Sequence, residues 1–339
     1  MEGLSSQRDI LLSVKEAIPA IHLIASHRSQ RPEILSVADT SYLEPQNHTD
    51  EAEKLAFITD VVQKHNVQLI HCGRNCSWFE KHRAAIESLD VKLITGATSL
   101  DTFALADDKF NYAQVMAQHG LPVVDSMMIT DVETLEEAVS NKPFGDKAVC
   151  IKPVTGIYGL GFWRFDDSVS FMKPLNDPDS RRIHPQQYLH ALRTMEKFEP
   201  LLLMPYLQGP ERSVDMIVDH GQVLGAIGRR KEGVYQQMEL DGPAIELAKA
   251  CAQIMNADGL VNVQTRNDAD GNPVLLEINM RPSGGICYTN HSGVNLPGLF
   301  AQYHLGLITA DEIKTNIYTH FSPAVVRSVT SVLPVSMDL

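Results

Sequence analysis

The sequence predicts an α/β fold whose C-terminal part mixes strands and helices in an α+β arrangement. In the first hundred residues, short apolar runs alternate with segments of helical spacing, which is typical of a parallel sheet covered by helices. Further along, several strand-like runs follow one another across tight turns. The chain has 339 residues, 44% of them hydrophobic, enough to bury two or three cores.

The overall composition narrows the possible partners and the compartment. The net charge is -13, whereas binding to a nucleic-acid backbone needs clustered Lys and Arg. The five cysteines are odd in number and scattered, so we expect buried thiols in a reducing compartment. Residues 1–13 do not read as a secretory signal, and no apolar stretch approaches the roughly 18 residues of a membrane span. We therefore expect a cytoplasmic protein without nucleic-acid or membrane partners.

Residues 1–97 are expected to form a small Rossmann-like domain. Its predicted helices are Asp50–His65 and Trp78–Leu89, and its predicted strands are Ile21–Ala25, Ile34–Ala38, Val67–His71 and Val91–Thr95. No Gly-x-Gly-x-x-Gly turn follows the first strand, so we assign no dinucleotide to this domain. Three polar residues lie at or after strand ends, His22, His27 and Arg74. Each of them either belongs to a surface loop or contacts a substrate.

The next segment contains a lysine in an apolar strand, followed by a glycine-rich loop. A helix over 98–119 is expected to break near Asp108, so that Lys109 opens its second piece. In the strand Ala148–Pro153, Lys152 must meet an anion or keep its ammonium in water. A strand rather than a helix is expected after the three glycines Gly156, Gly159 and Gly161. In Rossmann and P-loop turns, by contrast, the glycines open a helix. Such a loop either folds over phosphates or is a plain hairpin turn.

The remaining elements are assigned from apolar periodicity and turn residues. The expected strands are Val123–Ile129, Leu201–Leu207, one ending at Val218, one ending at Gly228, and Leu260–Thr265. The expected helices are Val132–Ser140, Pro185–Lys197, Pro243–Ala257 and Leu296–Leu305. The apolar run Val325–Pro334 is expected to pack back on a sheet. Arg229, Arg230 and Lys231 end one strand, where they are either solvated or in contact with a phosphate or a carboxylate.

The strand Leu275–Arg281 carries the most chemical information. Its side chains alternate with a period of two, so Glu277, Asn279 and Arg281 share one face. A carboxylate and an amide suit Mg²⁺, and a guanidinium suits a phosphoryl group, although a solvated strand face would look the same. The turn before this strand makes a hairpin that brings Gln264 and Glu277 together. The loop containing Ser283 and Gly284 has an open backbone, which suits the close approach of a substrate.

Taken together, the order of these parts resembles the ATP-grasp superfamily. The matching parts are Lys109, Lys152 with its glycine loop, Gly209-x-Glu211-x-Ser213-Val214-Asp215, Gln264 and Glu277-x-Asn279-x-Arg281. The branch with the carbamoyl phosphate synthetase large chain and carboxylate–amine ligases is the most similar. This resemblance spans roughly residues 20–306. It implies a preATP-grasp domain (1–97), an ATP-grasp domain (98–306) and a C-terminal segment that packs back (307–339). Within the ATP-grasp domain, 98–200 would include a small lid subdomain with the glycine loop, and 201–306 would be the Mg-ATP and substrate subdomain.

The resemblance also implies ATP and Mg²⁺ as cofactors and a role for each matching residue. Lys109, Lys152 and the loop glycines Gly156 and Gly159 would hold the phosphates. Met204 and Leu207 would bind adenine through the backbone, although many relatives have acidic residues where Met204 stands. The remaining implied roles are ribose binding by Glu211, Mg²⁺ binding by Glu277 with Asn279 or Gln264, and stabilisation of the transferring phosphoryl group by Arg281.

The function implied by the resemblance is an ATP-dependent ligase. It would join a small-molecule carboxylate to an amine through an acyl phosphate and release ADP and phosphate. Substrate selectivity would lie with Arg229, Arg230, Ser283 and Gly284. The alternatives are an ATP-binding regulatory protein that does not ligate, and an enzyme with a thiol acceptor. A nicotinamide enzyme lacks its glycine fingerprint here. A homodimer is the expectation from base rates.

Overall fold

The computed structural model describes residues 6–45, 50–73, 75–156, 159–329 and 332, and it divides the chain into two compact units. Unit 1 comprises the chain up to Phe103, Pro210–Gln264 and the chain from Ile278 on. Unit 2 comprises Ala104–Gly209 and Thr265–Glu277. Among the described residues, none of the helices has the length and apolar character that crossing a membrane requires.

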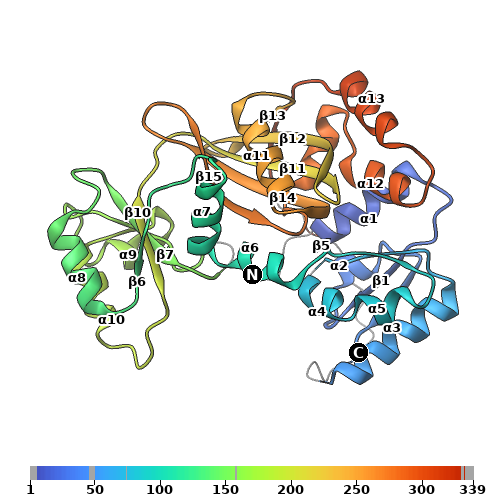
Figure 1. The fold of residues 1–339 in the computed structure, drawn as a ribbon, viewed down its shortest axis with the longest axis horizontal. Helices are drawn as coiled ribbons and strands as arrows, with labels where there is room; N and C mark the ends of the chain where they lie inside the picture. Colours follow the sequence, from blue (N-terminus) through green and yellow to red (C-terminus); the bar gives the residue numbers. More distant parts are fainter. Residues whose placement is uncertain (1–5, 46–49, 74, 157–158, 330–331, 333–339) are drawn as a thin grey trace. The chain divides into compact units, whose positions relative to one another are not determined.

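Unit 2 is built on a five-stranded sheet in the order β6-β10-β7-β8-β9, drawn in green shades in Figure 1. Strand β10 runs antiparallel to both of its neighbours, β6 and β7. The strands are β6 (Met127–Ile129), β7 (Val149–Pro153), β8 (Trp163–Phe165), β9 (Arg182–Ile183) and β10 (Leu201–Pro205). The helices are α7 (Lys109–Gln118), α8 (Val132–Asn141), α9 (Lys173–Asn176), the 3₁₀ helix η1 (Pro178–Ser180) and α10 (Pro185–Leu192).

The two faces of this sheet have different partners. On one face, Ile151 of β7 and Leu203 of β10 pack with Leu135 of α8 and Leu189 of α10, and all four side chains are buried. Because successive side chains of a strand alternate between faces, Lys152 and its cross-strand partner Leu202 lie on the other face. The apolar core of unit 2 thus occupies one face and leaves the other for a pocket.

The largest sheet of the chain has seven strands in the order β15-β14-β11-β12-β13-β16, with β5 paired to β14. These strands are β5 (Gly96–Ala97), β11 (Glu211–Asp219), β12 (Gln222–Glu232), β13 (Tyr235–Glu239), β14 (Ala257–Asn267), β15 (Pro273–Asn279) and β16 (Val325–Arg327). Strand β12 is antiparallel to both β11 and β13, and Ser213 is paired with Arg229. This pairing puts the polar side chains of the two strands on one face.

Helices from both ends of the chain pack together in unit 1 (Figure 1). Asn295, which caps α12, donates a hydrogen bond of 2.8 Å to the carbonyl oxygen of Ser13 in α1. Apolar residues of both helices join the core cluster that contains Ile217 and Ile227 of the large sheet. The helices of this part are α1 (Ser6–Ala17), α11 (Pro243–Ile254), the 3₁₀ helix η2 (Ile286–Ser292), α12 (Leu296–His304) and α13 (Ala310–His320).

The N-terminal part of unit 1 has the parallel strand pairing that the sequence predicts. Strand β1 pairs with β2, and β3 pairs with β4, both in parallel. The elements are β1 (Ile24–His27), α2 (Pro32–Leu35), β2 (Thr40–Leu43), α3 (Glu51–His65), β3 (Leu69–His71), α4 (Cys76–Lys81), α5 (Arg83–Glu87), β4 (Lys92–Ile94) and α6 (Leu100–Asp107). The prediction of a strand over Ile34–Ala38 is wrong, because Pro32 starts a short helix there and the strand follows it.

The structure corrects one further prediction, adds two elements and confirms part of another prediction. The helix predicted to reach Lys197 ends at Leu192. Strand β13 and helix α13 are absent from the prediction, although α13 carries a full capping box between Thr309 and Glu312. The prediction that the run Val325–Pro334 packs on a sheet is confirmed for Val325–Arg327, because β16 pairs with β13, and part of its remainder lies outside the described residues.

Candidate functional site

A narrow pocket lies within unit 2, on the sheet face opposite its apolar core. Strands β7 and β10 form its floor, and α7 and β15 contribute its walls. Its room is about 10 Å³, enough for roughly one water molecule. A larger ligand therefore requires its walls to separate. The lining residues are Lys109, Ala113, Val124, Ser126, Lys152, Leu202, Met204, Leu275 and Leu276.

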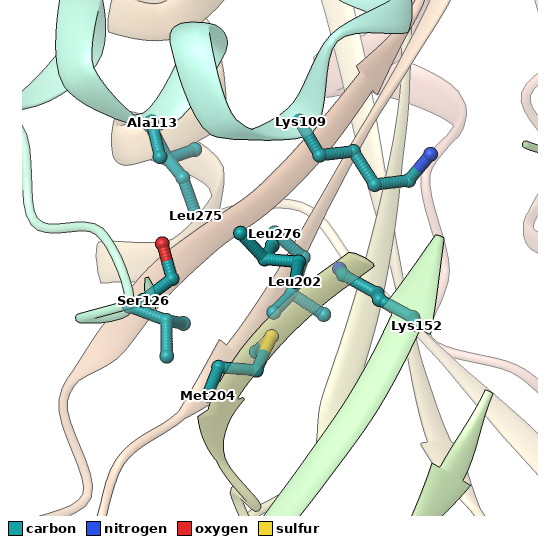
Figure 2. Close-up of a pocket in the computed structure, with 9 residues that line it drawn as sticks. Lys109, Ala113, Ser126, Lys152, Leu202, Met204, Leu275 and Leu276 are labelled. Atoms are coloured by element: carbon teal, nitrogen blue, oxygen red, sulfur yellow. The ribbon is translucent and has the colours of Figure 1, made fainter. Parts of the chain in front are cut away.

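Lys152 supplies a positive charge to this mainly apolar pocket. Figure 2 shows its side chain extending from β7 toward Leu202 and Leu276. The neighbouring residues Val149, Cys150 and Ile151 hold β7 in the sheet, and the last two are buried. The sheet pairing thus places the Lys152 side chain on the pocket face of β7. An ammonium in such a place favours an anionic ligand.

Lys109 reaches the same pocket from helix α7. The helix begins at Lys109 because the Asp108 carboxylate caps it, accepting hydrogen bonds from the Phe110 and Asn111 backbone amides at 3.1 and 3.0 Å. The Lys109 ammonium donates a hydrogen bond of 2.7 Å to the carbonyl oxygen of Gly156 and lies 3.8 Å from a Glu277 carboxylate oxygen. The structure therefore brings one of the lysines, the glycine loop and a carboxylate together.

Cys150 lies in the apolar cluster beside the pocket, together with Leu202 and Met204. Burial raises the pKa of its thiol to about 11, although Lys152 acts in the opposite direction. The thiol therefore stays protonated near neutral pH. It serves as a small apolar group and does not act as a nucleophile.

The glycine loop follows β7 directly. Gly156, Gly159 and Gly161 all have positive φ, at 147°, 63° and 75°, a backbone conformation that favours glycine. A Cβ atom at Gly161 would come within 2.8 Å of the Pro153 ring, so the backbone approaches the end of β7 closely there. Ile157 and Tyr158 lie outside the described residues.

The other expected metal and phosphoryl contacts belong to unit 1. Asn279 ends β15 and Gln264 lies on β14, and both side chains are half-buried next to buried apolar neighbours. Arg281 follows the strand and is half-buried as well. Carboxylate and amide oxygens, such as those of Glu277 in unit 2 and of Asn279 and Gln264 in unit 1, are hard donors of the kind that Mg²⁺ prefers.

Glu211 and all three clustered cations, Arg229, Arg230 and Lys231, are engaged in ion pairs. The carboxylate of Glu211, which opens β11, accepts a hydrogen bond from the Lys231 ammonium. Arg230 donates a hydrogen bond of 2.6 Å to Gln237 and lies 2.8 Å from a Glu232 carboxylate oxygen. A cation of the cluster thus already neutralises the carboxylate expected to bind ribose.

The structure brings together two of the residues expected to contact substrate, Arg229 and Ser283. Arg229 is 3% exposed, so the alternative of a solvated cation is wrong for this residue. Its guanidinium donates hydrogen bonds of 2.7 Å to the Ser283 hydroxyl and to the carboxylate of Asp215. The other Asp215 oxygen accepts a hydrogen bond of 2.9 Å from Asn262. Asp215 has no role among the sequence predictions. The period of two along the strand nevertheless places Asp215 on the same face as Glu211.

Several expected residues lie apart from these groups. Leu207 follows β10 and does not line the pocket, and Gly284 is half-buried in the loop after Ser283. His22, at 2.9 Å from the Thr40 hydroxyl, occupies an exposed position. Arg74 lies outside the described residues. The sequence analysis also missed the apolar lining from Leu275 and Leu276, whose signal is the apolar half of β15.

Comparison with known sequences gives a domain match in the C-terminal half. The family described as ATP-grasp in the biosynthetic pathway with Ter operon matches residues 197–331. The carbamoyl phosphate synthase large chain of Agathobacter rectalis is 22% identical over 300 residues, covering 82% of this chain and 25% of that protein. The tetrahydromethanopterin:alpha-L-glutamate ligase of Methanosarcina acetivorans is 27% identical over 146 residues, covering 43% and 42%. The chain thus spans at most 42% of either relative.

Solved structures share the fold over most of the chain. An L-amino acid ligase from Bacillus licheniformis has a TM-score of 0.63 at 14% identity, covering 91% of this chain and 74% of that one. A biotin carboxylase from Campylobacter jejuni has a TM-score of 0.62 at 19% identity, covering 90% and 70%. The chain therefore has the mixed α/β fold of these proteins. Its residues 197–331 match an ATP-grasp family, the superfamily that the sequence motifs resemble.

Proposed function

We propose that the protein, whose residues 197–331 match an ATP-grasp family, is an ATP-dependent ligase that joins a carboxylate to an amine and releases ADP and phosphate. The observation that carries the proposal is the pocket that Lys109 and Lys152 both line, with the Glu277 carboxylate 3.8 Å from the Lys109 ammonium. Cationic side chains in an apolar slot beside a carboxylate are the groups needed to hold a nucleotide and its metal. The relatives include ligases that form carbon–nitrogen bonds, which supports the same chemistry.

In the first proposed step, an oxygen of the substrate carboxylate attacks the γ-phosphorus of ATP. The bond between that phosphorus and the oxygen bridging to the β-phosphate breaks, and ADP leaves with the electron pair. The product is an acyl phosphate. Lys152, Lys109 and Arg281 would offset the charge that spreads over the phosphoryl oxygens, which is the main protein contribution in phosphoryl transfer.

In the second proposed step, the amine nitrogen attacks the carbonyl carbon of the acyl phosphate. Phosphate leaves with the carbon–oxygen electron pair, and the nitrogen loses a proton as the amide forms. The loop with Gly156 and Gly159 would cover the phosphates and keep water from the acyl phosphate. Met204 would contact the adenine on the pocket floor, and Glu211 would bind the ribose once Lys231 releases it.

Glu277, with Asn279 or Gln264, would hold Mg²⁺, because their oxygens are the hard donors that this cation prefers. The cation supplies charge neutralisation on the phosphates when it is bound.

The same proposal includes a division of the chain into a preATP-grasp domain (1–97), an ATP-grasp domain (98–306) and a C-terminal segment. It also includes a cytoplasmic location and a homodimer.

The test is a screen of amino acids and other small acids against amines for phosphate release from MgATP. We expect phosphate only when both partners of one pair are present. Lys152→Met should abolish the release, whereas the control Lys142→Met should retain it, because Lys142 is exposed and pairs only with Asp146 among the described residues. Tight MgATP binding with no phosphate from any pair would instead favour the regulatory alternative.

Adding thiols to this screen distinguishes a thiol acceptor. If phosphate release needs an acid and a thiol, and no amine supports it, a thiol takes the place of the amine in the second step. The first step and the roles of the pocket residues would remain as proposed.

A further inference from the structure

We propose that Arg229 is a positioning residue that fixes the loop from Ser283 to Gly285, and that it does not contact the substrate itself. All the residues concerned belong to unit 1. The link to catalysis rests on the proposed function, because the loop begins two residues after Arg281. The hold of Arg229 on the loop does not depend on that function.

The first observation is the burial of an ion pair. Asp215 on β11 is 0% exposed and Arg229 on β12 is 3% exposed, and the guanidinium Nε lies 2.7 Å from a carboxylate oxygen. Removing two charges from water costs several kcal/mol per ion, and their attraction commonly no more than offsets that cost. Such a pair contributes little net stability, so we look for its role in what it orients.

The second observation is the direction of the guanidinium bonds. Its two terminal nitrogens donate to different partners, the Gln236 side chain on β13 and the Ser283 hydroxyl, the latter at 2.7 Å. The Ser283 hydroxyl also accepts a hydrogen bond of 3.2 Å from the Gly285 backbone amide. Arg229 therefore ties the loop after β15 to strands β11 and β13 through one rigid planar group.

The third observation is the close packing of the loop backbone on the guanidinium. A Cβ atom at Gly285 would lie 2.6 Å from a terminal nitrogen of Arg229 and 3.1 Å from the Tyr288 ring. The Arg229 Cζ lies 5.7 Å from the centre of that ring, within the range of a cation–π contact. Three groups of this segment therefore contact the Arg229 guanidinium: the Ser283 hydroxyl, the backbone at Gly285 and the Tyr288 ring.

This geometry gives the position a requirement for arginine. Lysine carries a single ammonium on a flexible stem and cannot make three directed bonds to Asp215, Gln236 and Ser283. It would keep the positive charge beside Asp215 but release the loop. Arg229→Lys therefore separates the positioning role from the charge.

The experiment measures hydrogen exchange along the full chain by mass spectrometry, together with MgADP binding. In Arg229→Lys we expect exchange in the segment 281–290 to become about tenfold faster, since the bonds lost are charge-assisted. Exchange in α8 of unit 2 and the MgADP affinity should match those of the wild-type protein. Ser283→Ala, which removes only the hydroxyl, should loosen the same segment.

Arg83→Lys is the matched control, because Arg83 also makes several directed bonds, to Glu80, Glu87 and the carbonyl oxygen of Leu93. Its replacement should loosen the N-terminal part and leave 281–290 unchanged. Unchanged exchange in 281–290 of both Arg229→Lys and Ser283→Ala would overturn the inference. Exchange in Arg229→Lys that rises equally in α8 would overturn it too.

The catalytic link is read separately, with the acid–amine pair found in the phosphate screen. Arg229→Lys should lower kcat and leave KM for ATP unchanged, and equal kcat in the two proteins would overturn the link to Arg281. A wild-type protein that releases no phosphate from any pair contradicts the proposed function. The exchange result would still stand or fall by itself.

Discussion

At the scale of single residues, the pocket shows how lysines are kept in an apolar setting. Lys109 is 9% exposed, yet its ammonium contacts the Gly156 carbonyl oxygen at 2.7 Å and lies 3.8 Å from a Glu277 carboxylate oxygen. A buried ammonium without such groups would be costly. Because the same ammonium is proposed to meet phosphate, nucleotide binding requires it to exchange partners.

Arg281 is expected to act on turnover and hardly on nucleotide binding. Its proposed contact forms with charge that develops during phosphoryl transfer, and removal of one such donor costs roughly 10²–10³-fold in kcat. We therefore predict that Arg281→Ala lowers kcat by about that factor and leaves the Kd for MgADP within about threefold. Steady-state kinetics and calorimetry measure the two quantities. Equal turnover in the two proteins would remove Arg281 from the mechanism.

Two histidines of unit 1, the half-buried His71 and the buried His304, should make its stability depend on pH. His71 and His304 both pack against the Phe300 ring, and none of their ring nitrogens has a hydrogen-bond partner among the described residues. Burial lowers the pKa of each to about 4, from the ordinary value of 6.5, and Lys92 further lowers that of His304. Between pH 6.5 and 4 the unfolded chain binds more protons, so stability falls as the pH falls through this window.

For His304 the expected slope is about 1.4 kcal/mol per pH unit in the middle of that window. The double variant His71→Leu, His304→Leu should lose less stability than the wild-type protein between pH 7.5 and 5. Urea denaturation at both pH values measures the difference. An equal loss in the two proteins would show that the histidines are not neutral in the folded state.

At the scale of elements, the glycine loop depends on a backbone that passes close to the end of β7. Gly161 has a φ of 75°, and a Cβ atom there would come within 2.8 Å of the Pro153 ring. Gly145 has a φ of 67° with open space around it, so a side chain there meets only the backbone penalty. A comparison of substitutions at Gly161 and Gly145 therefore separates the effect of backbone strain from that of a steric clash.

We predict that Gly161→Ala lowers turnover with the screened acid–amine pair more than Gly145→Ala does, because only the first displaces the loop. Both should lose about 1 kcal/mol from the positive φ alone. Thermal melts and phosphate-release rates of the two variants provide the comparison. Equal turnover in both would mean that the loop does not need its close approach to Pro153.

The elements also show what could be predicted from sequence. The helix break at Asp108 was predictable, because a capping carboxylate and the residues it serves are adjacent in the chain. The pocket face of β7 followed from the period of two. The role of Arg229 could not be predicted, because its partners Asp215 and Ser283 reach it only through strand pairing and a loop that follows another strand. Tertiary contacts of that kind leave no local signal.

Strand β13 and helix α13 illustrate the same limit. The strand at Tyr235–Glu239 is short and carries polar residues, and its place in the sheet comes from pairing with β12 and β16 on its two sides. Helix α13 is mostly polar, with Ile313 and Ile317 as its buried residues. Their apolar content alone does not distinguish such elements from loops, and packing determines them.

At the scale of the whole molecule, the net charge of -13 opposes the approach of an anionic nucleotide. Binding must therefore rely on local cations, of which the structure gathers Lys109 and Lys152 in one pocket. In the proposed reaction, phosphoryl transfer to the carboxylate comes first and amide formation comes second.

The most direct test follows oxygen from the substrate carboxylate. With the acid of the active pair labelled by ¹⁸O in its carboxylate, the account predicts that each phosphate released carries one labelled oxygen, and that ADP is the nucleotide product. Phosphate without label, or label found in AMP, would contradict transfer of the γ-phosphoryl group to the carboxylate.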